Sequence, residues 1–173
     1  NQGDVISIIG SSGSGKSTIS SAILKKYKKN IPNLVNIDGD AVRDLYTDKL
    51  GYKVKDRIKQ IKRIQNICMF LENQGLVVIA SALYSNDKLL EWNKINFKNY
   101  FEIFLAADIA LVKKRDPKNI YKKFKSGMES NVVGLDIKYN IPKNQDLIID
   151  FKKNKTINSV VNRIINSMEI FKN

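Results

Sequence analysis

The sequence contains no histidine, one cysteine and only five arginines among its 30 basic residues. Without histidine, a general base in any active site would have to be a carboxylate, a lysine or the substrate itself. The single cysteine, Cys68, excludes an intramolecular disulfide, and its place in a helical apolar pattern predicts a buried, unreactive thiol. This cysteine usage fits a reducing cytoplasm.

Long hydrophobic segments are also missing. The longest uncharged apolar stretch runs from Gly75 to Leu83, far short of the roughly 20 residues that a membrane span needs. The first residues do not show the charged and then apolar pattern of a leader peptide. With 173 residues, 43% of them hydrophobic, the chain has enough material for one core and too little for two ordinary domains. We therefore expect one soluble domain over residues 1–173, with no membrane partner.

The net charge of +13 raises the question of nucleic acid, because a basic surface is the usual signature of phosphate-backbone binding. The basic residues are mostly lysines, 25 of the 30, scattered over all the predicted helices and mixed with asparagine. This distribution indicates solvated faces, so we expect no nucleic-acid partner. A nucleic-acid-binding protein or a non-catalytic nucleotide sensor stays as the alternative, and a homodimer stays open.

Alternating strand and helix patterns predict an α/β fold. Short β-branched segments predict strands at 4–9, 34–37, 76–80, 101–105 and 147–150. Helical patterns occupy 16–29, a segment that begins at Ala41, 55–73, about 110–114 and 158–171. Such alternation implies a five-stranded parallel sheet covered by helices on both faces. Residues 116–143 are polar and rich in Lys, Gly and Asn, which predicts a lid over an active site rather than part of the core.

A glycine-rich loop joins the first predicted strand to the first helix and matches Gly-x-x-x-x-Gly-Lys-Ser/Thr. Such a loop turns successive N–H groups towards the phosphates of ATP, while Lys16 adds a positive charge and Ser17 a hydroxyl ligand for Mg²⁺. The three-layer fold is therefore expected to be of the P-loop NTPase type. The expected ATP contacts from this loop are Gly10, Ser11, Ser12, Gly13, Ser14, Gly15, Lys16, Ser17 and Thr18.

The following strands exclude other P-loop classes. The strand at 76–80 lacks the terminal acidic residue of motor and transporter ATPases, and the segment at 93–96 lacks the Asp of a guanine-reading motif. A small-molecule kinase remains. Asp38 and Asp40 follow the second strand, where one carboxylate can order the magnesium shell and the other can accept the proton of an attacking hydroxyl. The simpler alternative is that Asp40 only caps the next helix.

Two of the rare arginines, Arg43 and Arg57, lie near the beginnings of the second and third helical segments. Arginine offers a planar fork for phosphate-like oxygens, whereas lysine offers a point charge. We therefore expect both to bind an anionic group of the acceptor, the alternative being that they face solvent.

These residues resemble the adenylyl-sulfate (APS) kinases, which phosphorylate the 3′-hydroxyl of adenosine 5′-phosphosulfate. The resemblance covers roughly residues 5–150 and is far more specific than the glycine loop alone. It rests on the segments 10–18, 38–43, 50–52 with 56–57, 79–81, 114–118 with 121–123, 126–127, 134–136 and 139–142.

The resemblance implies roles for individual residues. Asp40 would be the base, Asp38 and Ser17 would hold Mg²⁺, and Lys16 would act in catalysis. Arg115, Lys118 and Lys123 would engage ATP. On the acceptor side it implies that Arg43 and Arg57 hold the 5′-phosphoanhydride and that Tyr52 stacks near the base. The remaining acceptor contacts would be Gln60, Ser81, Val132 and Asp136.

The departures from the family cluster on the acceptor side. Gln60 stands where the family usually has Asn, and residues 84–87 read Tyr-Ser-Asn-Asp in place of Ser-Pro-Tyr-Arg. Val132 replaces the aromatic residue that packs on adenine. Loss of one stacking face costs about 1 to 3 kcal/mol for a flat base, which favours a smaller base.

Cytidine diphosphoramidate kinase of capsule phosphoramidate biosynthesis, a relative of the APS kinases, meets these conditions. It phosphorylates the 3′-hydroxyl of a cytidine nucleotide that bears a 5′-diphosphoramidate. We favour this acceptor, with APS as the alternative. A kinase for a sugar acid or shikimate is a third candidate, but the segments 115–118 and 134–136 match the nucleotide 3′-kinases better.

Overall fold

The computed structural model describes residues 3–172 and contains one parallel five-stranded sheet. The strands are β1 (Asp4–Ile9), β2 (Leu34–Asp38), β3 (Val77–Ala82), β4 (Tyr100–Ala106) and β5 (Leu147–Asp150). Their order is β2-β3-β1-β4-β5, and every pairing is parallel. The predicted α/β fold of the P-loop type is thereby confirmed, with strand bounds within two residues of the expected ones.

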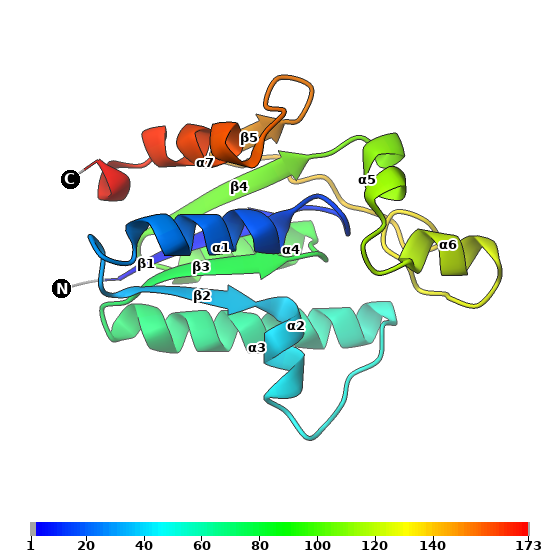
Figure 1. Ribbon diagram of the computed structural model, residues 1–173. Coiled ribbons are helices and arrows are strands. Elements are labelled where there is room, and N and C mark those ends of the chain that lie inside the picture. Colours follow the sequence, from blue (N-terminus) through cyan, green and yellow to red (C-terminus); the bar gives the residue numbers. More distant parts are fainter. Residues whose placement is uncertain (1–2, 173) are drawn as a thin grey trace.

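Helices cover both faces of this sheet (Figure 1). They are α1 (Lys16–Tyr27), α2 (Gly39–Asp44), α3 (Val54–Asn73), α4 (Asp87–Asn96), α5 (Ile109–Arg115), α6 (Ile120–Lys125) and α7 (Ile157–Asn166), followed by a 3-10 turn at Glu169–Phe171. One core packs α1 and α7 on the sheet through Ile19, Ile23, Val160 and Ile164. The other packs α3 and α4 through Ile61, Ile64, Cys68 and Leu89. No helix within residues 3–172 is long and apolar enough to cross a membrane.

Cys68 is 1% exposed, which confirms the expected buried thiol. Burial, together with the charge of Glu72, raises the pKa of Cys68 to about 12. The thiol is therefore protonated and inert at neutral pH.

Two helical predictions were inaccurate. The closing helix, expected to reach residue 171, ends at Asn166 because the hydroxyl and the backbone N–H of Ser167 both bond to the carbonyl of Ile164, at 2.6 and 3.1 Å. Helix α4 was not predicted. Its signal is Asn86, an N-cap whose side chain accepts a hydrogen bond of 2.9 Å from the N–H of Leu89.

The segment 116–143 was expected to lie outside the core, and this expectation was wrong in part. It contains α6 and five buried residues, Tyr121, Val132, Val133, Ile137 and Pro142. Val133 and Ile137 join the core under α3, while Val132 and Tyr121 pack on Val112 of α5. The segment is thus anchored at two points. In Figure 1 it lies beside the carboxyl ends of the strands, next to the glycine loop.

Candidate active site

The glycine loop forms between the end of β1 at Ile9 and the first residue of α1, Lys16. Gly13 and Gly15 have φ angles of 81° and 94°, a region that favours glycine. A Cβ on Gly13 would also come within 3.1 Å of the carbonyl oxygen of Val112. Gly15 at the N-cap brings no side chain to the first N–H groups of α1. These groups are therefore oriented to bind an anion, as the motif predicts.

Lys16 is held inside this loop, where its Nζ donates a 3.0 Å hydrogen bond to the carbonyl of Ser11. Burial lowers the pKa of Lys16 to about 8; the charge of Lys118 acts in the same direction, while Asp40 and Asp38 oppose the shift. The ammonium is thus poorly solvated. An entering phosphate group would compensate this desolvation, which is the property expected of a phosphate-binding lysine.

The carboxylate of Asp38 joins the end of β2 to the glycine loop. It accepts hydrogen bonds from the Ser17 hydroxyl at 2.7 Å and from the N–H of Asp40 at 2.8 Å. Partial burial raises the pKa of Asp38, but these bonds, with one from the N–H of Ala41, outweigh it and leave the pKa below its usual value. Asp38, and not Asp40, is therefore the N-cap of α2, so the capping alternative for Asp40 was wrong.

Ser17 and Asp38 together offer two adjacent oxygen ligands, which fits the preference of Mg²⁺ for hard donors. Within the described part of the chain, no group of three or more His, Cys, Asp or Glu side chains could hold a metal ion by itself. The pair therefore fits a magnesium ion that takes most of its ligands from phosphates and water, as is usual in phosphotransferases.

Two arginines lie against one tyrosine on the side of the site where the acceptor is predicted to bind. The guanidinium carbons of Arg43 and Arg57 are 4.5 and 5.5 Å from the ring centroid of Tyr52. Arg57 is only 8% exposed, so the solvent-facing alternative is wrong for this residue. Burial and the nearby charge of Arg43 lower the pKa of Arg57. Two guanidinium groups held this close would be stabilised by an anion between or beside them.

The backbone contacts of Arg57 tie two loops together. Its Nε donates to the carbonyl of Tyr52 at 2.9 Å, and its Nη2 donates to the carbonyl of Asn131 at 2.7 Å. Asn131 lies in the left-handed region with φ of 59°. The prediction that Tyr52 stacks near the acceptor base stays untested, but its ring already contacts both guanidinium groups.

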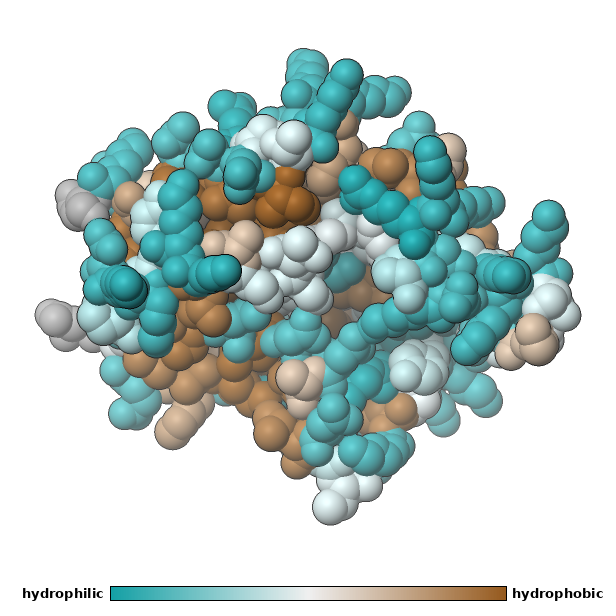
Figure 2. All heavy atoms as spheres, viewed as in Figure 1, coloured by the Kyte–Doolittle hydropathy of each residue, from teal (hydrophilic) through white to brown (hydrophobic). Residues whose placement is uncertain are grey.

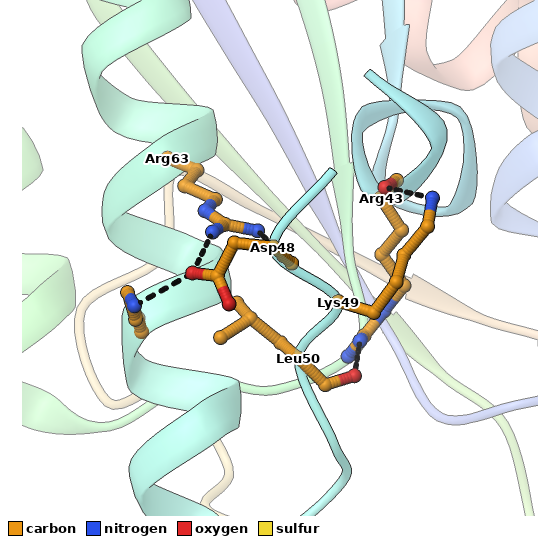
Figure 3. Close-up of polar contacts among 6 residues, drawn as sticks. Arg43, Asp48, Lys49, Leu50 and Arg63 are labelled. Atoms are coloured by element: carbon orange, nitrogen blue, oxygen red, sulfur yellow. Dashed lines mark hydrogen bonds and ion pairs between the residues drawn. The ribbon is translucent and has the colours of Figure 1, made fainter. Parts of the chain in front are cut away.

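The middle of the loop between α2 and α3 is fastened to both helices (Figure 3). Arg43 donates to the carbonyl of Leu50 at 3.0 Å, and Lys49 donates to the carbonyl of Arg43 at 3.3 Å. On the α3 side, Arg63 bonds to the carboxylate and the carbonyl of Asp48, at 2.9 and 3.1 Å. Arg43, which lies on α2, is therefore braced by this loop.

The glycine loop, the aspartate pair and the arginine pair all contribute to one cavity of about 780 Å³. The glycine loop forms one side, with Lys16, Ser17 and Thr18, and Arg43, Tyr52 and Arg57 line the other. Asp38 and Asp40 lie at the same cavity, which also has an aliphatic wall made of Ile61, Ile64, Val132 and Val133. With a phosphate-binding side and an aliphatic wall, the cavity can receive a phosphate donor and a second, partly apolar molecule side by side. Hydrophilic side chains, by contrast, project from most of the visible face of the molecule (Figure 2).

Comparison with known proteins identifies this arrangement. The family model described as adenylylsulphate kinase matches residues 2–150. The chain belongs to the adenylyl-sulfate kinase family. It is 31% identical to adenylyl-sulfate kinase of Staphylococcus carnosus over 95% of this chain and 83% of that protein. It is also 31% identical to cytidine diphosphoramidate kinase of Campylobacter jejuni, over 96% of each chain.

Solved structures agree. The Mycobacterium tuberculosis APS kinase in complex with AMPPNP and APS matches with a TM-score of 0.87 and 26% identity, covering 97% of this chain and 98% of that one. A gluconokinase from Sinorhizobium meliloti, at 14% identity and a TM-score of 0.61, shares the fold alone. The protein is thus an ATP-using phosphotransferase with an alcohol group as acceptor, which confirms the enzyme class expected from the sequence.

Most residues expected at the active site of this kinase line the cavity, including Gln60, Ser81, Arg115 and Lys118. Arg115 donates to the carbonyl of Gly13 at 3.5 Å. Gln60 donates to the carbonyl of Gly39 at 2.8 Å, next to the two aspartates.

The exceptions, which do not line the cavity, are Gly10, Ser11, Ser14, Lys123 and Asp136. Lys123 is exposed on α6. Asp136 accepts hydrogen bonds from the N–H groups of Asn131 and Val132 at 2.7 and 2.5 Å, and so shapes the turn that presents Val132 to the cavity. These backbone bonds lower the pKa of Asp136 against the opposing effect of burial. A direct contact between Asp136 and the acceptor therefore remains a prediction. Asp136 can also act indirectly, by positioning Val132 at the cavity.

Sequence analysis assigned no role to two residues that support the site. Tyr121 donates from its hydroxyl to the carbonyl of Ser12 at 3.1 Å and so connects α6 to the glycine loop. Asn131 supplies the carbonyl that orients Arg57. Tyr121 lies in a segment that carries the family resemblance, which was the available signal, whereas an interaction through a backbone carbonyl leaves no signal in the side chain of Asn131.

Proposed function

We propose that this kinase transfers the γ-phosphoryl group of ATP to the ribose 3′-hydroxyl of a nucleotide with a modified 5′-phosphoanhydride, and that cytidine diphosphoramidate is its acceptor. Adenylyl sulfate is the second candidate. The observation that carries the proposal is the single cavity, which joins a phosphate-binding loop, a carboxylate pair and an arginine pair.

On the donor side, the N–H groups of the glycine loop and Lys16 bind the β- and γ-phosphates. Arg115 adds a cation at the same loop, where it contacts the carbonyl of Gly13. Ser17 and Asp38 hold Mg²⁺, which when bound neutralises charge on the phosphate oxygens. The low pKa of Lys16 favours this role, because phosphate binding relieves the desolvation of its ammonium.

Asp40 is the residue that accepts the proton of the acceptor hydroxyl. The 3′-oxygen forms a bond to the γ-phosphorus, the bond from that phosphorus to the β,γ-bridging oxygen breaks, and ADP leaves with the electron pair. Asp38 is engaged by Ser17 and by the cap of α2, whereas Asp40 makes only an exposed contact with Lys118, which the hydroxyl can displace.

Arg43 and Arg57 bind the 5′-phosphoanhydride, and the aliphatic wall receives the base. Val132 gives this wall an aliphatic face, while Tyr84 at the same cavity is aromatic and the ring of Tyr52 already contacts both arginines. A base site with fewer aromatic faces favours the smaller pyrimidine base over adenine. The Campylobacter jejuni relative, which matches over 96% of both chains, acts on a cytidine compound by its name.

Adenylyl sulfate as the acceptor is favoured by a different observation. Relatives named adenylyl-sulfate kinase match at 31 to 34% identity, as closely as the cytidine enzyme does. The overlay on the structure that contains APS is also extensive, with a TM-score of 0.87. The overall likeness does not separate the two substrates, so the local aliphatic wall decides our preference.

The test is an ADP-release assay with cytidine diphosphoramidate, APS, CDP, gluconate and shikimate as acceptors. We expect kcat/KM for cytidine diphosphoramidate to exceed that for APS by at least about tenfold, a ratio that needs roughly 1.4 kcal/mol of differential transition-state binding. Efficient turnover of APS with no turnover of the cytidine compound would instead support APS as the acceptor. Efficient turnover of gluconate or shikimate alone would reject a nucleotide acceptor.

A further inference from the structure

The lid and the second aspartate are in direct contact. Lys118, between α5 and α6, forms an ion pair with Oδ2 of Asp40 at the end of β2. Both residues line the 780 Å³ cavity, and the charge of Lys118 also acts on Lys16 in the glycine loop. Lys118 therefore lies where the donor side, the acceptor side and the lid converge.

The backbone around Lys118 is held by hydrogen bonds, whereas its side chain is largely exposed to solvent. The carboxylate of Asp116 accepts from the N–H groups of Tyr121 and Lys122 at 3.2 and 3.0 Å, and the hydroxyl of Tyr121 bonds to the glycine loop. The side chains of Lys118 and Asp40, by contrast, are 57% and 68% exposed. An ion pair this exposed is weak and readily displaced.

We propose that Lys118 is a positioning residue that occupies the carboxylate of Asp40 until the acceptor hydroxyl displaces it, and that this contact suppresses hydrolysis of ATP in the absence of an acceptor. The inference rests on the proposed role of Asp40 as the base. It changes the role expected for Lys118, from a contact to ATP to a gate on Asp40.

The suppressed reaction is the attack of water on the γ-phosphoryl group. A water oxygen would bond to the γ-phosphorus, its proton would pass to Asp40, and the bond to the β,γ-bridging oxygen would break to release ADP and phosphate. While Lys118 holds Oδ2, fewer acceptor sites of the carboxylate are open to orient a water. The nucleotide acceptor, which is also bound by the arginine pair, has the additional binding energy to displace Lys118.

The test measures ADP release from ATP without acceptor. For Lys118→Met, which keeps the length of the side chain but removes the charge, we expect a rise of about two- to fivefold, the factor that an exposed ion pair is worth. Lys118→Arg keeps the charge, so its rate should rise less than that of Lys118→Met. Lys125→Met is the matched control, because Lys125 is an exposed lysine on α6 that lies outside the cavity.

A double variant shows whether the effect acts through Asp40. Adding Asp40→Asn to Lys118→Met should return hydrolysis to the level of Asp40→Asn alone. Hydrolysis by Lys118→Met that is unchanged or lower than wild type overturns the proposal, and a loss together with weaker ATP binding would make Lys118 a phosphate contact. If Lys118→Met does not fold, the rate of ADP release by Lys118→Arg decides. A rise of about two- to fivefold in this variant, which keeps the charge, would show that the charge does not gate Asp40.

The outcomes also separate this inference from the proposed acceptor. If the wild type phosphorylates no nucleotide while Lys118→Met still hydrolyses ATP faster through Asp40, the acceptor is wrong and the gate stands. If the wild type phosphorylates a nucleotide and the variant shows no rise, the gate is wrong and the acceptor stands.

Discussion

Replacement of Arg57 by lysine should damage both stability and acceptor use, while leaving ATP binding intact. The guanidinium group donates to the carbonyls of Tyr52 and Asn131, and it is 8% exposed. A lysine ammonium keeps the charge but cannot reach two carbonyls on different loops. Each hydrogen bond from a charged group contributes about 1.5 to 3 kcal/mol, so the loss of one, partly offset by the new ammonium, should cost about 2 kcal/mol.

Thermal unfolding and steady-state kinetics measure the two effects. For a chain of this size about 2 kcal/mol corresponds to a fall in Tm of about 4 to 8 °C. We also expect kcat/KM for the nucleotide acceptor to fall by about tenfold or more, with little change in the Kd of an ATP analogue, because Arg57 lies on the acceptor side of the cavity. Arg163→Lys, on an exposed position of α7, is the control. An unchanged Tm together with normal acceptor kinetics would refute the assignment of Arg57 as the link between the two loops.

Three further predictions follow from the site. Since burial lowers the pKa of Lys16 to about 8, ATP binding above this pH must take up a proton. The affinity for ATP, measured by titration calorimetry, should therefore fall by up to about tenfold per pH unit as pH rises through 8. The same pH dependence in Lys16→Arg would contradict this prediction. Asp40→Asn should lower kcat by about 10² or more with modest change in ATP binding, and a greater loss in Asp38→Asn would exchange the two roles. Val132→Phe should shift the ratio of kcat/KM values towards APS, because a ring is worth about 1 kcal/mol or more against adenine; an unchanged ratio would remove Val132 from the base site.

The conformation of the phosphate-binding loop could be predicted from the sequence. A phosphate-binding loop is a local structure, in which a strand, glycines that adopt positive φ and a helix N-terminus follow one another along the chain. The positions of Gly13, Gly15, Lys16 and Ser17 were therefore expected correctly. The strands were equally readable, since buried parallel strands are continuous β-branched runs.

The acceptor half depends on contacts between distant segments and was less readable. Arg57 and Asn131 are 74 positions apart in the chain, and their contact uses a backbone carbonyl that every residue type possesses. The buried positions of the 116–143 segment were missed for a similar reason. Val133 and Ile137 lie in a short apolar run with no strand or helix period, and the turn stabilised by Asp136 brings them to the core.

The contact between Lys118 and Asp40 shows a further limit of a family resemblance. The resemblance predicted that both residues belong to the active site, and both line the cavity. It did not predict that they contact each other, because the partner of a long, exposed lysine depends on which charges the fold brings within its reach.

The central claim is that this kinase phosphorylates a nucleotide on its ribose 3′-hydroxyl and prefers the cytidine compound. The most direct measurement is identification of the product by NMR after the wild-type protein is incubated with ATP, Mg²⁺ and equal concentrations of cytidine diphosphoramidate and APS. We predict that the new phosphate appears on the 3′-oxygen and that the cytidine product forms first and in excess. A product phosphorylated at any other position, or exclusive formation of 3′-phosphoadenylyl sulfate, would contradict the account.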